Sequence, residues 1–450
     1  MSGKKSVLSI LILTLAALLA GCGSSSSVTT PPTTLPPTGI KKRVLVSNQQ
    51  PPVPLTGVVN IVDAQHDVIS SKTITVTNPT KMVTAGGQTA IISSSLAQVS
   101  IFDNTTEAVT FTPATADFPV DVVITPDGKT VWVAERNNGF VQSIDTASGV
   151  VTNSIPVPSV QRLVLSPNGT KLLAFSNNPQ GLPAPNPPPN PPTPPPPSPF
   201  QDAFFVIDTA AVVNTHQATP IQMSPGDQPF TAVFDNSETK AFILNCGSGC
   251  GGTDRTATNS PTPPSVAVVD ITNPAAPVIG TRVAVPAATA GFLQGSDLYI
   301  AGTTSPAAAV SPGTGFLLVV DAASLALAGA PVQITDGLQT LIVPTGNNRL
   351  YIGSQGCTAG PIQSNNTRAG CLTIANITSP TAPTVTVPLE SSFRQNFDVT
   401  AIQPISGRSV IYVVQGGELD FFDANTDAVS TTIIPIDIVG KAVGAVQIDP

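Results

Sequence analysis

Few residues in this chain are of types that form covalent links, bind metals or catalyse reactions. The cysteines are the first of these. Five cysteines and only two histidines occur in 450 residues. Four of the cysteines follow Cys22, and an even number in an exported chain favours disulfides. The pairs expected from their spacing are Cys246 with Cys250 and Cys357 with Cys371. A zinc site is the alternative, but such sites usually use Cys-x2-Cys pairs or nearby histidines. We therefore expect no metal and no cofactor.

A second set of candidates is charged and lies in segments between predicted strands. Carboxylate and guanidinium groups that met near one centre could bind a small polar ligand or a peptide terminus. They could equally face solvent or pair with one another. Two scattered histidines and the lack of a Ser/His/Asp pattern leave no set of residues for general acid and base catalysis. The candidate ligand-binding residues are Asp117, Glu135, Arg136, Arg162, Asp227, Asp336 and Arg394.

An acidic or amide residue recurs along the chain, always at the end of a β-branched run. A ring of such carboxylates would be a tempting binding site. Each residue, however, precedes a turn sequence such as Thr-Ala-Ser-Gly, where its side chain can accept backbone N–H bonds. We therefore expect a structural role. The eight positions are Asp63, Asp103, Asp145, Asp208, Asp270, Asp321, Asn376 and Asp423.

The elements that carry these residues are predicted to be strands. The clearest unit runs from Pro119 to Val133, with a Pro-Asp-Gly turn at 126–128, and continues from Phe140 to Val151. Alternating β-branched residues between turn residues indicate four strands. The markers are spaced by 40 to 63 residues, and the longer spacings contain insertions. The underlying period of about 40 to 45 residues is that of a four-stranded propeller blade.

The two ends of the repeat array predict how the ring closes. The first unit begins at Lys42–Val46 as a second strand with no inner strand before it, and the chain ends on Val443–Pro450, which resembles an inner strand. We expect an all-β propeller of four-stranded antiparallel blades, closed by the C-terminal strand, which protects an open sheet edge. Eight markers favour eight blades. A weak inner strand around Met82 leaves seven open.

The third and fourth units resemble the YVTN-type β-propeller repeat, also described as lactonase-like. The residues that carry the resemblance are Ile124–Val133, with Thr-Pro-Asp-Gly-Lys-Thr-Val-Trp in it, and Ser143–Thr152. It extends over residues 118–176 and is thin elsewhere. The resemblance implies a bacterial surface location and a propeller fold more than an activity.

Long insertions fall between the second and third strands of their units. Because alternate strands are antiparallel, these insertions would all emerge on one face of the disc. One of them, within residues 177–200, contains a proline run that predicts a stiff polyproline II finger or a simple spacer. A scaffold with one elaborated face usually binds through it. The insertions are Ser47–Thr56, Asn177–Pro199, Cys246–Pro264, Thr303–Gly315 and Ser354–Gly370.

The N-terminus resembles a bacterial lipoprotein signal. Lys4 and Lys5 precede an apolar run that ends in Leu-Ala-Gly-Cys22, and that run is too short for a permanent membrane span. The resemblance implies a signal at 1–21, a palmitate-bearing lipid anchor on Cys22, a tether at 22–40 and a single propeller domain at 41–450. Gly23 in place of an Asp favours the outer membrane, facing the periplasm or the outside.

The net negative charge and the lack of a catalytic residue pattern limit the functions we expect. Removal of the signal brings the formal charge from −8 to −10, so nucleic acid is not an expected partner. We expect a monomeric, noncatalytic surface lipoprotein that binds a protein or peptide through its long-looped face and contacts the membrane through its lipid. A lactonase-like or metal-assisted hydrolase at the central funnel and an architectural envelope component are the alternatives.

Overall fold

The computed structural model describes most of the chain from residue 36 onward. The described ranges are 36–49, 57–93, 95–176, 202–211, 216–223, 227–247, 263–304, 313–358, 369–386, 398–430, 432–438 and 440–449. Cys22, Cys250, Arg394, the proline run and the predicted signal and tether up to residue 35 lie outside them. Residues from Pro37 to Pro450 form one compact unit. No helix within the described ranges could cross a membrane.

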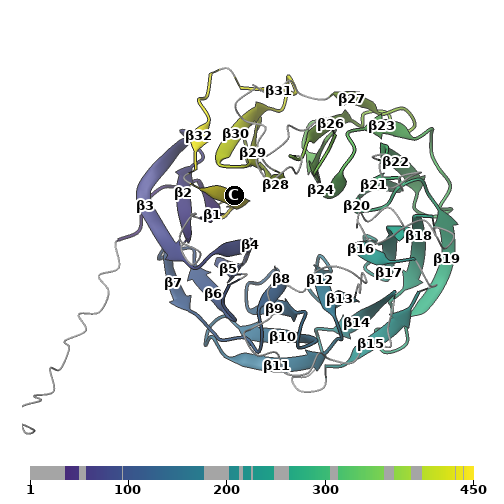
Figure 1. The fold of residues 1–450 in the computed structure, drawn as a ribbon, viewed down its shortest axis with the longest axis horizontal. Helices are drawn as coiled ribbons and strands as arrows, with labels where there is room; N and C mark the ends of the chain where they lie inside the picture. Colours follow the sequence, from purple (N-terminus) through teal and green to yellow (C-terminus); the bar gives the residue numbers. More distant parts are fainter. Residues whose placement is uncertain are drawn as a thin grey trace, which may run out of the picture. The chain divides into compact units, whose positions relative to one another are not determined.

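The first four sheets are antiparallel blades of four strands each, and they follow one another around the ring (Figure 1). Blade 1 contains β33 (Lys441–Gln447), β1 (Arg43–Gln49), β2 (Gly57–Asp63) and β3 (Val68–Val76). Blade 2 contains β4 (Pro79–Ala85), β5 (Gln88–Ser93), β6 (Val99–Asp103) and β7 (Ala108–Phe111). Blade 3 contains β8 (Pro119–Ile124), β9 (Thr130–Glu135), β10 (Phe140–Asp145) and β11 (Val151–Pro156). Blade 4 contains β12 (Val160–Leu165), β13 (Lys171–Ser176), β14 (Ala203–Asp208) and β15 (Ala218–Gln222).

The other four blades complete the ring and confirm the count of eight. Blade 5 contains β16 (Pro229–Phe234), β17 (Lys240–Asn245), β18 (Ser265–Asp270) and β19 (Val278–Ala284). Blade 6 contains β20 (Ala290–Gln294), β21 (Asp297–Thr303), β22 (Gly315–Asp321) and β23 (Val332–Ile334). Blade 7 contains β24 (Leu338–Thr345), β25 (Arg349–Gln355), β26 (Leu372–Asn376) and β27 (Thr384–Thr386). Blade 8 contains β28 (Val399–Pro404), β29 (Val410–Gln415), β30 (Glu418–Asp423), β31 (Ala428–Val429) and β32 (Ile436–Asp437), which also pairs with β30.

The ring closes as predicted from its ends. β33, at the C-terminus, pairs antiparallel with β1, and Leu45 lies opposite Val446. β33 is therefore the inner strand of a blade whose other three strands are N-terminal, so every blade has a complete inner strand.

The hydrophobic core lies between neighbouring blades. The second and third strands supply most of it, because both of their faces are covered by adjacent sheets. Tyr412 and Phe421 of blade 8, for example, pack with Val44 and Val62 of blade 1 in one buried cluster. Inner strands line the centre of the disc and are only partly buried, which explains why the inner strand β4 has a weak hydrophobic pattern.

All eight recurring acidic or amide residues end the third strand of their blade, as predicted. In each of them a side-chain oxygen accepts a hydrogen bond from a backbone N–H two or three residues further on. In Asp145 the acceptor Oδ1 lies 2.8 Å from Ser148 N. These residues therefore hold turns, and their carboxylates are spread around the rim instead of converging.

Replacing Asp145 with alanine should lower the free energy of unfolding by about 1 kcal/mol, because the turn loses its acceptor. Asparagine at the same position should cost under about 0.5 kcal/mol, since Asn376 accepts the equivalent bond in blade 7. Urea denaturation of both variants measures the difference. Equal destabilisation by the two substitutions would contradict the turn-holding role.

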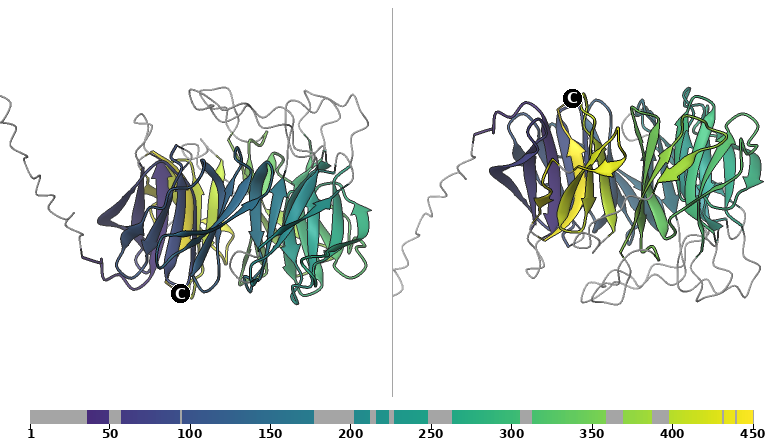
Figure 2. Two further views of the ribbon diagram at one scale, coloured as in Figure 1. Left: turned by 90° about the horizontal axis from the view of Figure 1, so that it is seen from below. Right: turned by 90° about the horizontal axis from the view of Figure 1, so that it is seen from above.

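The two faces of the disc differ in their connections (Figure 2). In blades 2 to 8 tight turns join the first strand to the second, and one of them is the predicted Pro126-Asp127-Gly128 turn, in which Gly128 has φ 72°. We call this side the turn face. The predicted insertions join second strands to third strands, so they attach at the opposite side, the long-looped face.

Candidate functional site

A hollow of about 600 Å³ lies at the centre of the ring. The first residues of the inner strands line it, and the end of β1 and the end of β25 add Gln49 and Gln355. Inner strands begin where blade-joining segments arrive, which is the side of the long-looped face. The hollow, which we call the funnel mouth, therefore opens on the long-looped face. Among the described residues, every blade except blade 6 contributes to it.

A one-residue bulge marks the start of the inner strand in seven of the eight blades. The pairing register with the second strand shifts there by one residue, while β20 of blade 6 pairs without a shift. Bulges bend a strand and re-aim its side chains, and they are frequent next to binding sites. The residues left unpaired are Thr80, Val120, Gln161, Phe230, Thr340, Thr400 and Val443, and all but Phe230 line the funnel mouth.

The charged residues of the funnel mouth gather on four successive blades. Lys441 lies on β33, Lys81 on β4, Asp121 on β8 and Arg162 on β12. Lys81 forms an ion pair with Asp121. Three cations thus face one carboxylate, and this half of the funnel mouth carries a net positive charge.

Asp121 is saturated by partners from the protein itself. Its Oδ1 accepts from Val122 N at 2.9 Å as well as from Lys81, and its Oδ2 accepts from Leu163 N at 2.7 Å. The carboxylate therefore bridges blades 2, 3 and 4 and has little capacity left to neutralise other cations.

Arg162 lies against an aromatic ring. The guanidinium carbon is 3.8 Å from the centroid of Phe230, a cation–π distance. Burial lowers the pKa of Arg162, and the negative charge of Asp121 opposes that effect. Among the described residues no hydrogen-bond acceptor or carboxylate contacts its N–H groups.

Asp117 and Glu135 lie together in blade 3, as two of the predicted candidates. The Glu135 side chain is fully buried, and its Oε1 accepts from Ala116 N at 3.2 Å. Its Oε2 and the Oδ2 of Asp117 are buried without a partner among the described atoms. Burial, and secondarily the negative charge of Asp117, raises the pKa of Glu135 to about 7. Glu135 therefore binds a proton near neutral pH.

Replacing Glu135 with glutamine should stabilise the protein at pH 8. The folded-state pKa of Glu135, about 7, lies above its ordinary 4.5, so the folded state binds more protons in that window and the wild type loses stability as pH rises through it. A neutral side chain removes this loss, worth about 3 kcal/mol at pH 8 and almost nothing near pH 4. Urea denaturation across pH 4 to 8 measures the gap. Parallel curves for the two proteins would refute the assignment.

The remaining predicted candidates do not converge on one centre. Asp227 is fully buried and forms an ion pair with Arg282 of blade 5. The carboxylate of Asp336 accepts from the backbone N and the Oγ1 of Thr358, at 2.8 and 2.7 Å. Arg136 follows β9, half-buried, and burial lowers the pKa of its guanidinium. Of the candidates that the structure describes, only Arg162 lines the funnel mouth, and Arg394 lies outside the described residues.

Sequence reasoning missed Lys81, Asp121 and Lys441. All three occur within the first three residues of an inner strand. A charged residue at that place was a readable signal of an open centre, since a charge on a fully buried strand would be costly. Their neighbourhood depends on the closure of the ring, because Lys441 and Lys81 are 360 residues apart in the chain.

A disulfide braces one connection of the long-looped face. Cys357 and Cys371 are bonded as predicted, with 5.9 Å between their Cα atoms and a sequence separation of 14. The bond joins the two ends of the segment between β25 and β26 and limits its conformations. Cys246 is also in a disulfide. Its predicted partner Cys250 lies outside the described residues.

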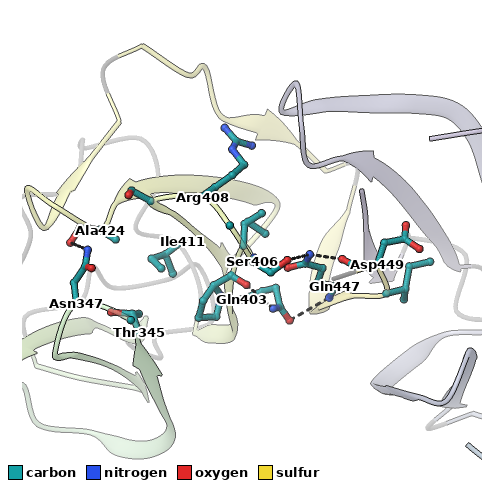
Figure 3. A pocket seen from close by; sticks show the side chains of 15 residues that line it. Thr345, Asn347, Gln403, Ser406, Arg408, Ile411, Ala424, Gln447 and Asp449 are labelled. Atoms are coloured by element: carbon teal, nitrogen blue, oxygen red, sulfur yellow. Dashed lines mark hydrogen bonds between the residues drawn. The ribbon is translucent and has the colours of Figure 1, made fainter. Parts of the chain in front are cut away.

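A second hollow, of about 630 Å³, lies on the turn face between blades 7, 8 and 1 (Figure 3). Its polar groups bond to one another: Gln447 donates through Nε2 to Ser406 Oγ at 2.6 Å, and its backbone N donates to Gln403 Oε1 at 3.1 Å. Both charged residues in its lining are engaged in ion pairs, Arg408 with Asp67 and Asp449 with Arg43. The polar and charged groups named here are thus paired within the protein, whereas Arg162 and Lys441 of the funnel mouth have no carboxylate partner among the described residues.

Solved structures resemble this chain although no family model and no curated protein matches it. Dihydro-heme d1 dehydrogenase NirN superimposes with a TM-score of 0.61 at 10% identity, covering 90% of this chain and 75% of that chain. The fold is a β-propeller. AztD from Citrobacter koseri gives a TM-score of 0.51 at 14% identity, covering 90% and 98%. Hydrazine synthase from Kuenenia stuttgartiensis gives 0.51 at 14%, covering 80% and 95%. Identities this low establish the fold alone.

Within the described residues no group of three or more His, Cys, Asp or Glu side chains is placed to hold a metal ion. The described residues offer two features for binding, the cations of the funnel mouth and the protonatable carboxyl group of Glu135 in blade 3.

Proposed function

We propose that the protein is an exported, noncatalytic binding protein of the YVTN-type propeller class. A lipid on Cys22 anchors it in the bacterial envelope, preferably at the outer membrane, and it binds a partner with its long-looped face. The observation that carries the proposal is the one-sided attachment of the insertions, between β1 and β2, β13 and β14, β17 and β18, β21 and β22, and β25 and β26. The funnel mouth and the Cys357–Cys371 disulfide belong to the same face.

Rigid blades beneath elaborated connections are the usual arrangement of a recognition surface. The disulfide restricts one connection before any partner binds, which lowers the entropy lost on binding. The proline run in residues 177–200 supplies a further polyproline segment for a partner groove.

The anchor is tested by metabolic labelling with a palmitate analogue. The wild type should incorporate the label and fractionate with the outer membrane, and Cys22→Ser should do neither. Labelling of the Cys22→Ser variant would refute the anchor.

The binding face is tested by photocrosslinking in living cells. A photoreactive residue at Asn138, in the β9–β10 connection, should crosslink to a partner, whereas the same residue at Lys129 on the turn face should not. Lys129 is a matched control because its side chain is 78% exposed and lies in the same blade. Crosslinks from Lys129 alone would place the binding face on the wrong side of the disc. Replacing residues 178–200 with a short Gly-Ser linker then tests the proline run itself.

A further inference from the structure

We propose that the funnel mouth binds a small organic acid with at least two carboxylates, held by Arg162 and Lys441. The proposal deepens the function above and rests on it, because it names the ligand class that the long-looped face would hold at its centre. It concerns the funnel mouth alone and needs no particular conformation of the insertions.

The charge balance of the funnel mouth favours an anion. Asp121 is occupied by Lys81 and by two backbone N–H groups, so its charge is already compensated. Arg162 and Lys441 have no carboxylate partner among the described residues. A net positive, partly enclosed funnel attracts anions and concentrates them.

Of the two cations without a carboxylate partner, Arg162 gives the stronger evidence for a ligand. A partly desolvated guanidinium without a hydrogen-bond acceptor costs free energy, and the contact with Phe230 and the charge of Asp121 leave its N–H donors without an acceptor. Stacking on the ring of Phe230 restricts the orientation of the planar guanidinium. A guanidinium held in one orientation suits bidentate binding of a carboxylate. An arrangement that costs stability in the free protein and gains a partner on binding is characteristic of a ligand site.

The two cations without a carboxylate partner come from different blades. Lys441 and Arg162 lie on the inner strands of blades 1 and 4, so they are three blades apart around a ring of eight. An acid with two carboxylates can pair with each of these cations separately, whereas a monocarboxylate offers one charge for both. A hollow of about 600 Å³ is within the usual range for small-molecule sites.

The opposite half of the funnel mouth suits a carbon skeleton more than a bare inorganic ion. Thr231, Thr340 and Thr400 supply hydroxyl groups there, and the half-buried Leu341 supplies apolar surface. Hydroxyl groups can bond to a substituted organic acid, and apolar carbons can cover its methylene groups.

Titration calorimetry with four probes tests the assignment on the full-length protein purified from the envelope fraction. The probes are citrate, acetate, inorganic phosphate and the uncharged trimethyl citrate, each at low ionic strength, where screening is weak. Citrate should bind at least about tenfold more tightly than acetate or phosphate, and trimethyl citrate should not bind. Citrate should also raise the unfolding temperature.

Three variants locate the site. Arg162→Gln should weaken citrate binding by about tenfold or more and Lys441→Gln by about threefold or more, because each removes one charged contact. Lys129→Gln changes the net charge equally on the turn face and should bind citrate within about twofold of the wild type. Arg162→Gln should unfold at the same temperature as the wild type or higher without citrate, which separates a ligand role from a structural one.

The proposal is overturned if the wild type binds no citrate, or if Arg162→Gln binds it as the wild type does. Equal affinity for phosphate and citrate overturns the assignment to an organic acid. A loss of unfolding temperature in Arg162→Gln without citrate, with citrate affinity unchanged, assigns Arg162 to the fold instead. The photocrosslinking result at Asn138 is independent of all these measurements, so failure of the funnel site and failure of the binding face are distinguishable.

Discussion

A chain truncated after Gly440 should lose its cooperative unfolding transition. The truncation removes β33, and with it the pairing of six β1 residues and the buried side chains of Ala442 and Ala445. β1 would then present an open edge to solvent, which promotes association with other chains. Circular dichroism during thermal unfolding, together with size-exclusion chromatography, should show a broad transition and aggregated protein.

A circular permutant is the matched control for this truncation. In it, residues 441–449 precede Lys41 through a short turn, and the chain ends at Gly440. Ile448 N already bonds to Arg43 O at 3.0 Å, so the two ends are close enough to join. The permutant should fold and unfold cooperatively, because every strand pair is restored. A truncated chain that unfolds as sharply as the wild type would show that closure by β33 is dispensable.

Replacing Glu107 with alanine should destabilise the protein by about 3 to 5 kcal/mol, the usual cost of removing one partner from a buried ion pair. Glu107 has a fully buried side chain and contacts Arg43 at 2.9 Å and Lys72 at 3.2 Å. It also accepts from Thr38 N at 2.7 Å. Arg43 in turn contacts Asp449 at 2.6 Å, so the carboxylate of Glu107 joins blade 2 to both ends of the closing blade.

The pH dependence of this network has a definite sign. Burial raises the pKa of Glu107, but the hydrogen bonds from Thr38, Arg43 and Lys72 together lower it below its ordinary 4.5. A lowered folded-state pKa contributes stability above pH 4.5 that is lost as pH falls through the folded value. The gap between wild type and Glu107→Ala should therefore shrink in acid.

The control for Glu107 is an exposed ion pair. Lys129 and Asp127 lie 3.4 Å apart with most of both side chains exposed, so Lys129→Ala should cost under about 0.5 kcal/mol. Urea denaturation at pH 7 and pH 4 measures all three proteins. A Glu107→Ala protein as stable as Lys129→Ala at pH 7 would mean that the network contributes nothing to closure.

The repeat predicted the architecture because its markers are local. Asp145 and its seven equivalents hold turns through side-chain bonds to residues two or three positions away, so the sequence around each one contains the whole structural reason for it. The turn glycines are similarly local: Gly128 needs its positive φ whatever lies across the blade. In blade 2 the first turn is formed by Gly86 and Gly87, which both have positive φ.

The candidate site was less predictable because its residues come from different blades and meet only when the ring is closed. The proposed set combined blade-joining residues that share a face, and the structure brings Asp117 to Glu135 but gives Asp227 a partner of its own, Arg282. Residues on one face of a disc can be far apart, and only the ring diameter and the bulges decide which of them reach the centre. Those are properties of sheet packing and pairing register, which one blade sequence does not contain.

The sequence by itself therefore determined the four-stranded unit, its repetition and the closing role of its last strand, since turn chemistry and alternation act over a few residues. It also determined the Cys357–Cys371 disulfide, whose partners are 14 residues apart. Tertiary structure alone decided which charges meet. Lys81, Asp121, Arg162 and Lys441 become neighbours because blades 1 to 4 place the starts of their inner strands around one centre, and chain distance carries no information about that contact.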